Sequence, residues 1–120
     1  MNKKSLCFEQ EDLGALAKVM KALASPVRLE IVAALGTEGS CLCELQPRFQ
    51  LDKSTLCRHI AALKNAGIVS EHRVGNRVRL QLATPCILNV FQCAMAVLRV
   101  AARKQARSVP YKYKKAFPNS

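Results

Sequence analysis

Cysteine has the most distinctive chemistry in this chain of 120 residues, and two of the six cysteines, Cys41 and Cys43, stand one residue apart. Thiolates select soft, thiophilic ions, and thiols also exchange with disulfides. The other four are Cys7, Cys57, Cys86 and Cys93. The opening residues MNKKSLCFEQ lack the apolar run of a secretory signal. We therefore expect a reducing, cytoplasmic location, in which the cysteines are thiols or metal ligands rather than disulfides.

A second group of side chains suits contact with nucleic acid. The segment 53–65 carries five basic or hydroxyl residues near its start: Lys53, Ser54, Thr55, Arg58 and His59. Arginine makes bidentate contacts to guanine, and hydroxyl groups bond to bases or phosphates. Three arginines of the segment 68–82 are expected to contact the DNA backbone or the minor groove: Arg73, Arg77 and Arg79.

The distribution of charge favours the same kind of partner. The net charge is +11, and all eight acidic residues lie within the first 71 positions. From His72 onward there are ten lysines and arginines and no acidic residue. This asymmetry indicates a polyanionic partner, with nucleic acid preferred over a membrane surface. No apolar run approaches the length of a membrane span, so no membrane partner is expected.

Hydrophobic periodicity and helix-end signals predict the elements that carry these side chains. Helices are expected at about 9–24, 26–36, 40 to 47 or 48, 53–65 and 84 to 103 or 107, and strands at 68–73 and 77–82. Asp52 is a suitable cap for the helix at 53–65, and Gly67 supplies the residue that ends it. Thr84 is the expected cap of the last helix, with Pro85 at its first position.

These elements together predict a mainly α-helical winged helix-turn-helix with a small β-hairpin, in which Gly75 and Asn76 join the two strands. The last helix is apolar on nearly all sides, which is typical of a helix that packs against a second copy of the chain. We therefore expect a homodimer formed through the terminal helices. A two-fold dimer is expected to bind an inverted repeat in double-stranded operator DNA.

The chain length suits a single domain with one hydrophobic core. Residues 1–8 are predicted to form an N-terminal arm, and 9–107 the winged helix-turn-helix domain for DNA binding and dimerisation. Residues 108–120 are predicted to be a basic, disordered tail, because they show no hydrophobic periodicity.

Four segments of the chain resemble the ArsR/SmtB family of metal- and metalloid-responsive repressors: LASPVRLEIVAAL, CLCEL, LDKSTLCRHIAALKNAGIV and RVGNRVRLQL. The resemblance extends from about Leu13 to Ala101. It implies a homodimer of the arsenical-resistance repressor type. Such a repressor controls a resistance operon and leaves its operator when the inducer binds.

Within this resemblance, Cys41 and Cys43 match the thiols of the family's Cys-x-Cys-Asp/Glu-Leu site. The implied inducer is As(III) or Sb(III), with Cd(II) or Pb(II) as the alternative, and no organic cofactor is expected. Arsenic-responsive members often place a third thiol three residues further on, where this chain has Gln46. The third ligand is therefore expected to come from elsewhere.

Cys7 is the first choice for that ligand, because cadmium- and lead-responsive relatives complete the site from an N-terminal arm. Cys93 and Cys86 are the rivals, since they are seven residues apart on the predicted last helix and so share one face. Cys57 is interpreted as a small buried side chain rather than a ligand. A zinc site on the last helix is not expected, because residues 83–103 contain neither Asp nor His.

Other functions agree less well with the residues. A repressor switched by cysteine oxidation or persulfide is the main alternative, although Cys41 and Cys43 point apart on a helix. A constitutive DNA-binding protein with inert cysteines is a further alternative. An enzyme is not expected, because Cys57 and His59 diverge on one helix and cannot form a nucleophile–base pair. The chain also has no phosphate-binding loop or glycine-rich cofactor motif.

Overall fold

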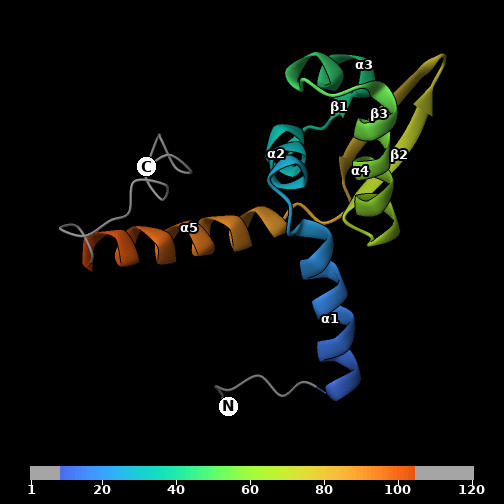
Figure 1. Cartoon of the computed structure of the whole chain (residues 1–120). Coiled ribbons are helices and arrows are strands. Elements are labelled where there is room, and N and C mark those ends of the chain that lie inside the picture. The colour runs from blue at the N-terminus through green and yellow to red at the C-terminus, as the bar shows by residue number, and fades with distance from the viewer. Residues whose placement is uncertain (1–8, 105–120) are drawn as a thin grey trace. The chain divides into compact units, whose positions relative to one another are not determined.

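The structure is a computed structural model that describes residues 9–104 (Figure 1). The elements are α1 (Gln10–Leu23), α2 (Pro26–Leu35), β1 (Ser40–Cys41), α3 (Leu42–Leu45), the 3-10 turn η1 (Gln46–Arg48), α4 (Lys53–Asn65), β2 (Val69–Val74), β3 (Arg77–Leu82) and α5 (Ile87–Lys104). The chain divides into two compact units between Pro85 and Cys86. The predicted arm with Cys7 and the predicted tail lie outside the described residues.

Helix α2 begins and ends at residues with clear local reasons. Ser25 precedes it in extended conformation and its hydroxyl accepts a hydrogen bond from the backbone N–H of Arg28, while Pro26 occupies the first turn. Gly36 follows the helix with a φ of 54°, and its N–H bonds to the Val32 carbonyl. The predicted boundaries of this helix are confirmed.

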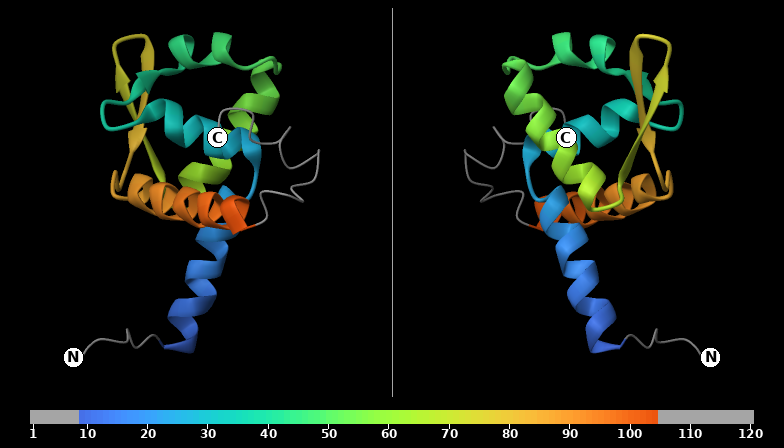
Figure 2. Two further views of the ribbon diagram at one scale, coloured as in Figure 1. Left: turned by 90° about the vertical axis from the view of Figure 1, so that its left-hand side faces the viewer. Right: turned by 90° about the vertical axis from the view of Figure 1, so that its right-hand side faces the viewer.

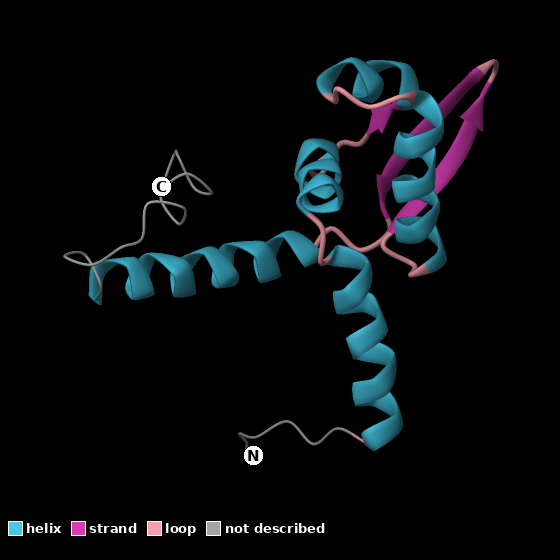
Figure 3. Cartoon of the chain, viewed as in Figure 1, coloured by secondary structure: helices cyan, strands magenta, loops and turns pink. Residues whose placement is uncertain are grey.

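The segment 40–48 differs from the single short helix predicted for it. Ser40 and Cys41 form the strand β1, α3 covers only Leu42–Leu45, and the chain tightens into η1 (Figure 3). The cause is Gly39, whose φ of 80° brings its backbone against β3, where a Cβ atom would lie 2.6 Å from the Leu80 carbonyl oxygen. The two residues that follow are thereby extended and pair with β3 before the helix begins.

The sheet has three antiparallel strands in the order β1-β3-β2. Ser40 pairs with Leu80 and Cys41 with Arg79, so β1 adds a third strand to the predicted hairpin. The hairpin itself is confirmed, and Gly75 turns the chain at its tip with a φ of 64°. In all three views α4 begins at the end of the unit where the hairpin tip lies (Figures 1 and 2).

The core of this unit is aliphatic and is built by α2, α4 and the strands. The apolar face predicted for α4 is fully confirmed, since Leu56, Ile60 and Leu63 are all buried. The other main core side chains are Ile31, Val32 and Leu35 of α2, Leu45 of α3, and Leu80 and Leu82 of β3. Gly67 follows α4 with a φ of 83°, as predicted. The rotation of α4 is therefore fixed by its buried face.

Helix α5 begins at Ile87, and the predicted start at Pro85 is wrong. Thr84 lies in a bend, while Pro85 and Cys86 form a turn in which the Asn89 N–H bonds to the Cys86 carbonyl at 2.9 Å. None of the 18 residues of α5 is buried. Helix α1 also leaves part of its apolar stripe exposed, at Leu13, Leu16 and Met20. Within residues 9–104 we find no helix with the length and hydropathy needed to cross a membrane.

Candidate nucleic-acid interface and thiol site

Helix α4 carries the five side chains predicted on it to contact DNA. Lys53, Ser54 and Arg58 are exposed, whereas Thr55 and His59 are half-buried. Because Leu56, Ile60 and Leu63 fill the core, the helical repeat turns Ser54 and Arg58 to the opposite side. The structure thus brings together on one helix the five residues predicted for it.

The first turn of α4 is organised around the carboxylate of Asp52. The Ser54 hydroxyl donates a hydrogen bond to Asp52 Oδ2 at 2.8 Å. Hydrogen bonds from the Thr55 hydroxyl, and then from the Ser54 hydroxyl, lower the pKa of Asp52. Both hydroxyl groups keep their oxygen lone pairs, so in this arrangement they present acceptors rather than donors to a ligand.

His59 is tied to a residue that sequence reasoning missed. The Nε of Arg28 on α2 donates to His59 Nδ1 at 3.1 Å, and Nη1 of the same guanidinium donates to the Ala22 carbonyl at 3.3 Å. Arg28 and His59 are 31 positions apart, and no periodicity or spacing in the sequence relates them. Only the packing of α2 against α4 reveals the contact.

The three arginines of the hairpin occupy two different environments. Arg73 and Arg77 are exposed near the tip. Arg79 is half-buried, and its Nη2 donates to the Glu38 carbonyl at 2.7 Å. Arg79 therefore fastens the chain before β1 to the strand β3, in addition to any contact with DNA that was predicted for it.

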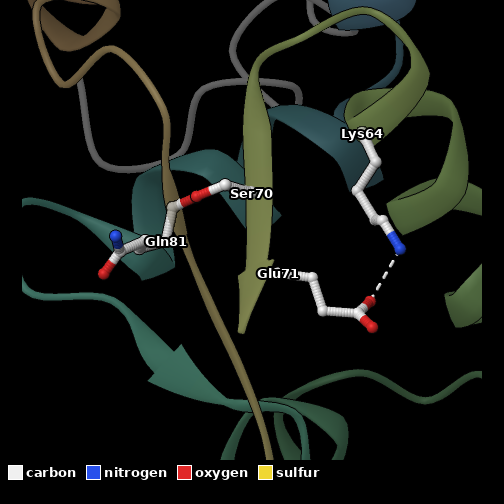
Figure 4. A network of polar contacts seen from close by, with 4 residues as sticks. All are labelled: Lys64, Ser70, Glu71 and Gln81. Atoms are coloured by element: carbon white, nitrogen blue, oxygen red, sulfur yellow. Dashed lines mark hydrogen bonds and ion pairs between the residues drawn. The ribbon is translucent and has the colours of Figure 1, made fainter. Parts of the chain in front are cut away.

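An ion pair joins helix α4 to the hairpin, and a second polar contact lies within the hairpin (Figure 4). Lys64 Nζ lies 2.7 Å from Glu71 Oε1, which pairs the last turn of α4 with β2. The Ser70 hydroxyl donates to the Gln81 carbonyl at 3.4 Å between the two long strands. Both ion-pair partners are more than a third exposed, so this pair contributes at most about 1 kcal/mol. Its main effect is to fix the hairpin relative to α4.

The cysteine pair lies at the junction of β1 and α3. Cys41 is the residue that caps α3: its sulfur accepts a hydrogen bond from the Glu44 N–H, and Glu44 Oε1 accepts one from the Cys41 N–H at 3.2 Å. Cys41 is half-buried and Cys43 is exposed. Two accessible thiols of this kind fit a thiophilic ion, for which sulfur is the preferred ligand.

Of the other four cysteines, Cys57, Cys86 and Cys93 lie within the described residues, and Cys7 lies outside them. Cys57 is half-buried and borders a pocket of about 160 Å³ lined mainly by apolar side chains such as Leu42, Ile60 and Leu80. Cys86 and Cys93 are exposed, one just before α5 and one on it. Among residues 9–104, no three His, Cys, Asp or Glu side chains gather into a group that would hold a metal ion. The third ligand predicted for the cysteine pair is thus still a prediction.

Comparison with known proteins identifies the family. The model of the family described as "Bacterial regulatory protein, arsR family" matches residues 25–71. The arsenical resistance operon repressor of Staphylococcus aureus is 30% identical over 77 residues, which cover 64% of this chain and 74% of that protein. The chain belongs to the arsR family. The resemblance found in the sequence is confirmed, and arsR-family proteins are regulators of transcription rather than enzymes.

Further relatives extend this picture. The HTH-type transcriptional repressor SmtB of Mycobacterium tuberculosis is 32% identical over 87 residues, 72% of this chain but only 64% of that protein. This arsR-family chain thus spans less than two thirds of the length of that repressor. The crystal structure of M. tuberculosis Rv0081 matches 82% of this chain and 99% of its own, with a TM-score of 0.73 and 27% identity.

The winged helix-turn-helix architecture predicted from the sequence is also confirmed. The homodimeric winged helix-turn-helix DNA-binding domain Mb0332 of Mycobacterium bovis matches 80% of this chain and 91% of its own, with a TM-score of 0.66. At 23% identity this likeness concerns the fold alone. The roles of individual residues in DNA or metal binding remain predictions for this arsR-family member.

Proposed function

We propose that this protein is a transcriptional repressor that binds operator DNA as a homodimer and is released when a thiophilic ion, As(III) or Sb(III), binds its cysteine thiolates. The observation that carries the proposal is the outward face of α4, where Ser54 and Arg58 are exposed opposite a buried apolar face and Lys53 is exposed in the first turn. Membership of the arsR family gives this face its expected partner, double-stranded DNA.

The dimensions of α4 suit the major groove. Its 13 residues make a helix about 20 Å long. Arg58, on its exposed side, is placed to make a bidentate contact to guanine, worth about 1–3 kcal/mol of discrimination between bases. Arg73 and Arg77 near the hairpin tip add contacts to phosphates or to the minor groove, and Arg79 is a further candidate there.

The apolar faces of the two terminal helices support a homodimer. Leu13, Leu16 and Met20 are exposed on α1, and Val97 and Val100 on α5. Exposed apolar side chains gathered on one helix indicate an interface with another chain. The homodimeric M. bovis domain of the same fold favours a second copy as that partner. A two-fold dimer then binds an inverted repeat with half-sites about one helical turn apart.

The thiols of Cys41 and Cys43 are proposed to hold the inducer. Relatives named as arsenical resistance operon repressors support As(III) or Sb(III). A cadmium resistance regulatory protein CadC homologue of S. aureus, 34% identical over 68 residues, supports Cd(II) or Pb(II) as the alternative. Cys7 is the first candidate for the third ligand, and Cys93 and Cys86 are the others.

The position of Cys41 supplies a route from the thiols to the DNA-binding face. Its sulfur caps α3, the first helix of the helix-turn-helix, and its backbone pairs with Arg79 of the hairpin. When Cys41 binds an ion, the sulfur that caps α3 is pulled toward the ion's other ligands. A shift of this sulfur moves α3 and β1 relative to α4. A hundredfold loss of operator affinity needs only about 2.7 kcal/mol of coupling.

The test is a Cys41→Ser/Cys43→Ser variant, with Cys57→Ser as the matched control. Serine is a good cap, so the double variant keeps α3 intact but loses both thiolates. Fluorescence anisotropy of labelled operator DNA should show release by arsenite or cadmium for wild type and for Cys57→Ser, and at least tenfold less release for the double variant. Full release from the double variant would place the inducer site elsewhere.

The same titration separates the alternative, a repressor switched by cysteine oxidation or persulfide. The reduced protein is titrated under argon with arsenite in one series and with peroxide or persulfide in another. Release by the ion alone supports the proposal. Release by peroxide or persulfide without the ion supports the redox alternative.

A further inference from the structure

The guanidinium of Arg28 joins three parts of the fold at one point. It belongs to α2, it donates through Nη1 to the Ala22 carbonyl in the last turn of α1, and it donates through Nε to His59 Nδ1 on α4. We propose that Arg28 is a positioning residue of the DNA-binding face. It holds His59 as the tautomer with its proton on Nε2, so that His59 serves as a neutral hydrogen-bond donor to DNA. This inference rests on the proposed DNA-binding function.

The tautomer follows from the chemistry of the two side chains. Arginine is protonated at all accessible pH values, and every nitrogen of its side chain is a donor. A hydrogen bond of 3.1 Å from Arg28 Nε to His59 Nδ1 therefore requires a lone pair on Nδ1. A neutral imidazole with its lone pair on Nδ1 carries its proton on Nε2. The contact is incompatible with a ring protonated at both nitrogens.

The second hydrogen bond of Arg28 gives this arrangement its rigidity. The last carbonyls of a helix have no partner within the helix, and Nη1 satisfies one of them at Ala22. The guanidinium is planar, so two bonds to different elements fix both its position and its plane. The ring of His59 is half-buried and accepts the hydrogen bond from Nε. Arg28 thus restricts the direction in which Nε2–H can point.

His59 borders the face proposed to contact DNA. His59 is one turn beyond Thr55 and next to the exposed Arg58, and within residues 9–104 its Nε2 has no hydrogen-bond partner. The Ser54 hydroxyl donates to Asp52, so His59 adds a neutral donor to a face where this hydroxyl acts as an acceptor. The matching atoms on DNA are acceptors: phosphate oxygens, or N7 and O6 of purines in the major groove.

The first experiment examines the free protein and needs no DNA. The chain has two histidines, so the ¹⁵N spectrum of the imidazole nitrogens can be assigned with a single His59→Gln variant. We expect wild-type His59 near neutral pH to be entirely the Nε2–H tautomer, and Arg28→Met to convert it to a mixture. His72, whose Nε2 contacts the Gln81 amide, is the internal control and should not change. A wild-type His59 with its proton on Nδ1 would overturn the inference.

The second experiment is a double-mutant cycle on DNA affinity, using duplexes selected from a random pool by the wild-type protein. Arg28→Met should weaken binding about fivefold, the worth of one neutral hydrogen bond, but should have little effect in a His59→Phe background. His59→Gln, which places an amide donor near the position of Nε2, should restore part of the affinity. Equal losses from Arg28→Met in both backgrounds would show that Arg28 contacts DNA directly and would overturn the positioning role.

The same variants separate the two kinds of acceptor. If Nε2–H bonds to a purine, His59→Phe relaxes the preference at one position of the selected sites. If it bonds to a phosphate, His59→Phe weakens all sequences equally and leaves the salt dependence unchanged, because a neutral ring displaces no counterion. Failure of the wild-type protein to select any duplex would refute the proposed function. The tautomer result would be unaffected by that outcome.

Discussion

Residues 25–82 and helix α5 place their apolar side chains in opposite environments. In the first region, seven large side chains are almost completely buried: Ile31, Val32, Leu35, Leu45, Leu56, Leu63 and Leu80. In α5, which contains residues such as Phe91, Met95 and Leu98, no side chain is buried. The first region has a core of its own, whereas among residues 9–104 no residue of α5 is buried.

The apolar residues of the two regions therefore have different roles. The core of residues 25–82 fixes α4, so its apolar residues serve the geometry of the polar face. The apolar residues of α5, and Leu13, Leu16 and Met20 of α1, are best explained by a second copy of the chain. Mutations in the two regions should therefore differ in how their effects depend on protein concentration.

The largest effect is expected from Leu63→Ala in the core, compared with Val97→Ala on α5. Leu63 is fully buried, so truncation should lower the free energy of unfolding by about 2–5 kcal/mol at every protein concentration. Val97 is 67% exposed, so its truncation should change the stability of the isolated chain by less than about 0.5 kcal/mol. Urea unfolding at several protein concentrations measures both values.

Unfolding at several protein concentrations tests whether the apolar residues of α5 belong to a dimer interface. If α5 forms the dimer interface, the cost of Val97→Ala should increase at concentrations where the wild-type dimer is populated. Analytical ultracentrifugation should show weaker association for this variant and unchanged association for Leu63→Ala at temperatures where it is folded. A cost for Val97→Ala that is large at low concentration would contradict the distinction between the two regions.

The next effect concerns Gly39, which allows β1 to approach β3. Its φ is +80°, and an added Cβ would lie 2.6 Å from the Leu80 carbonyl oxygen, a backbone atom that cannot easily move. Gly39→Ala should therefore cost about 1–3 kcal/mol in urea unfolding. Gly14 is the matched control. It lies within α1 with no atom within 4 Å of an added Cβ, so Gly14→Ala should stabilise the chain by about 0.5–1 kcal/mol. Similar effects of both variants would contradict the close approach at Gly39.

The contrast between Gly39 and α4 also explains how much the sequence could reveal. The start and end of α4 were predictable because Asp52, Gly67 and three core residues at helical spacing are local signals that agree with one another. Asp52 occupies the N-cap position, but its side chain makes no capping hydrogen bond. Strand β1 was not predictable, because two residues have no periodicity and their partners in β3 are far along the chain. The contact between Arg28 and His59 was hidden for the same reason. Local signals predicted most of the elements, but not the division of residues 40–48 or the start of α5, and contacts between distant segments required the structure.

The smallest effect on stability is expected from Asp52→Asn. The carboxylate of Asp52 organises the first turn of α4, the proposed DNA-reading helix. Because hydrogen bonds from Thr55 and Ser54 lower its pKa, the charged form stabilises the folded state. This contribution is complete above the unfolded-state pKa of about 3.9 and is lost as the pH falls through the lower folded-state value. Thermal unfolding between about pH 6 and pH 2 should show a smaller acid-dependent loss for Asp52→Asn than for wild type. Thr55→Ala should reduce the acid-dependent loss of stability more than Ser54→Ala does, because Thr55 is the larger cause of the lowered pKa of Asp52. Equal pH profiles for wild type and Asp52→Asn would show that these hydroxyls are not bonded to the carboxylate and are free to donate to DNA.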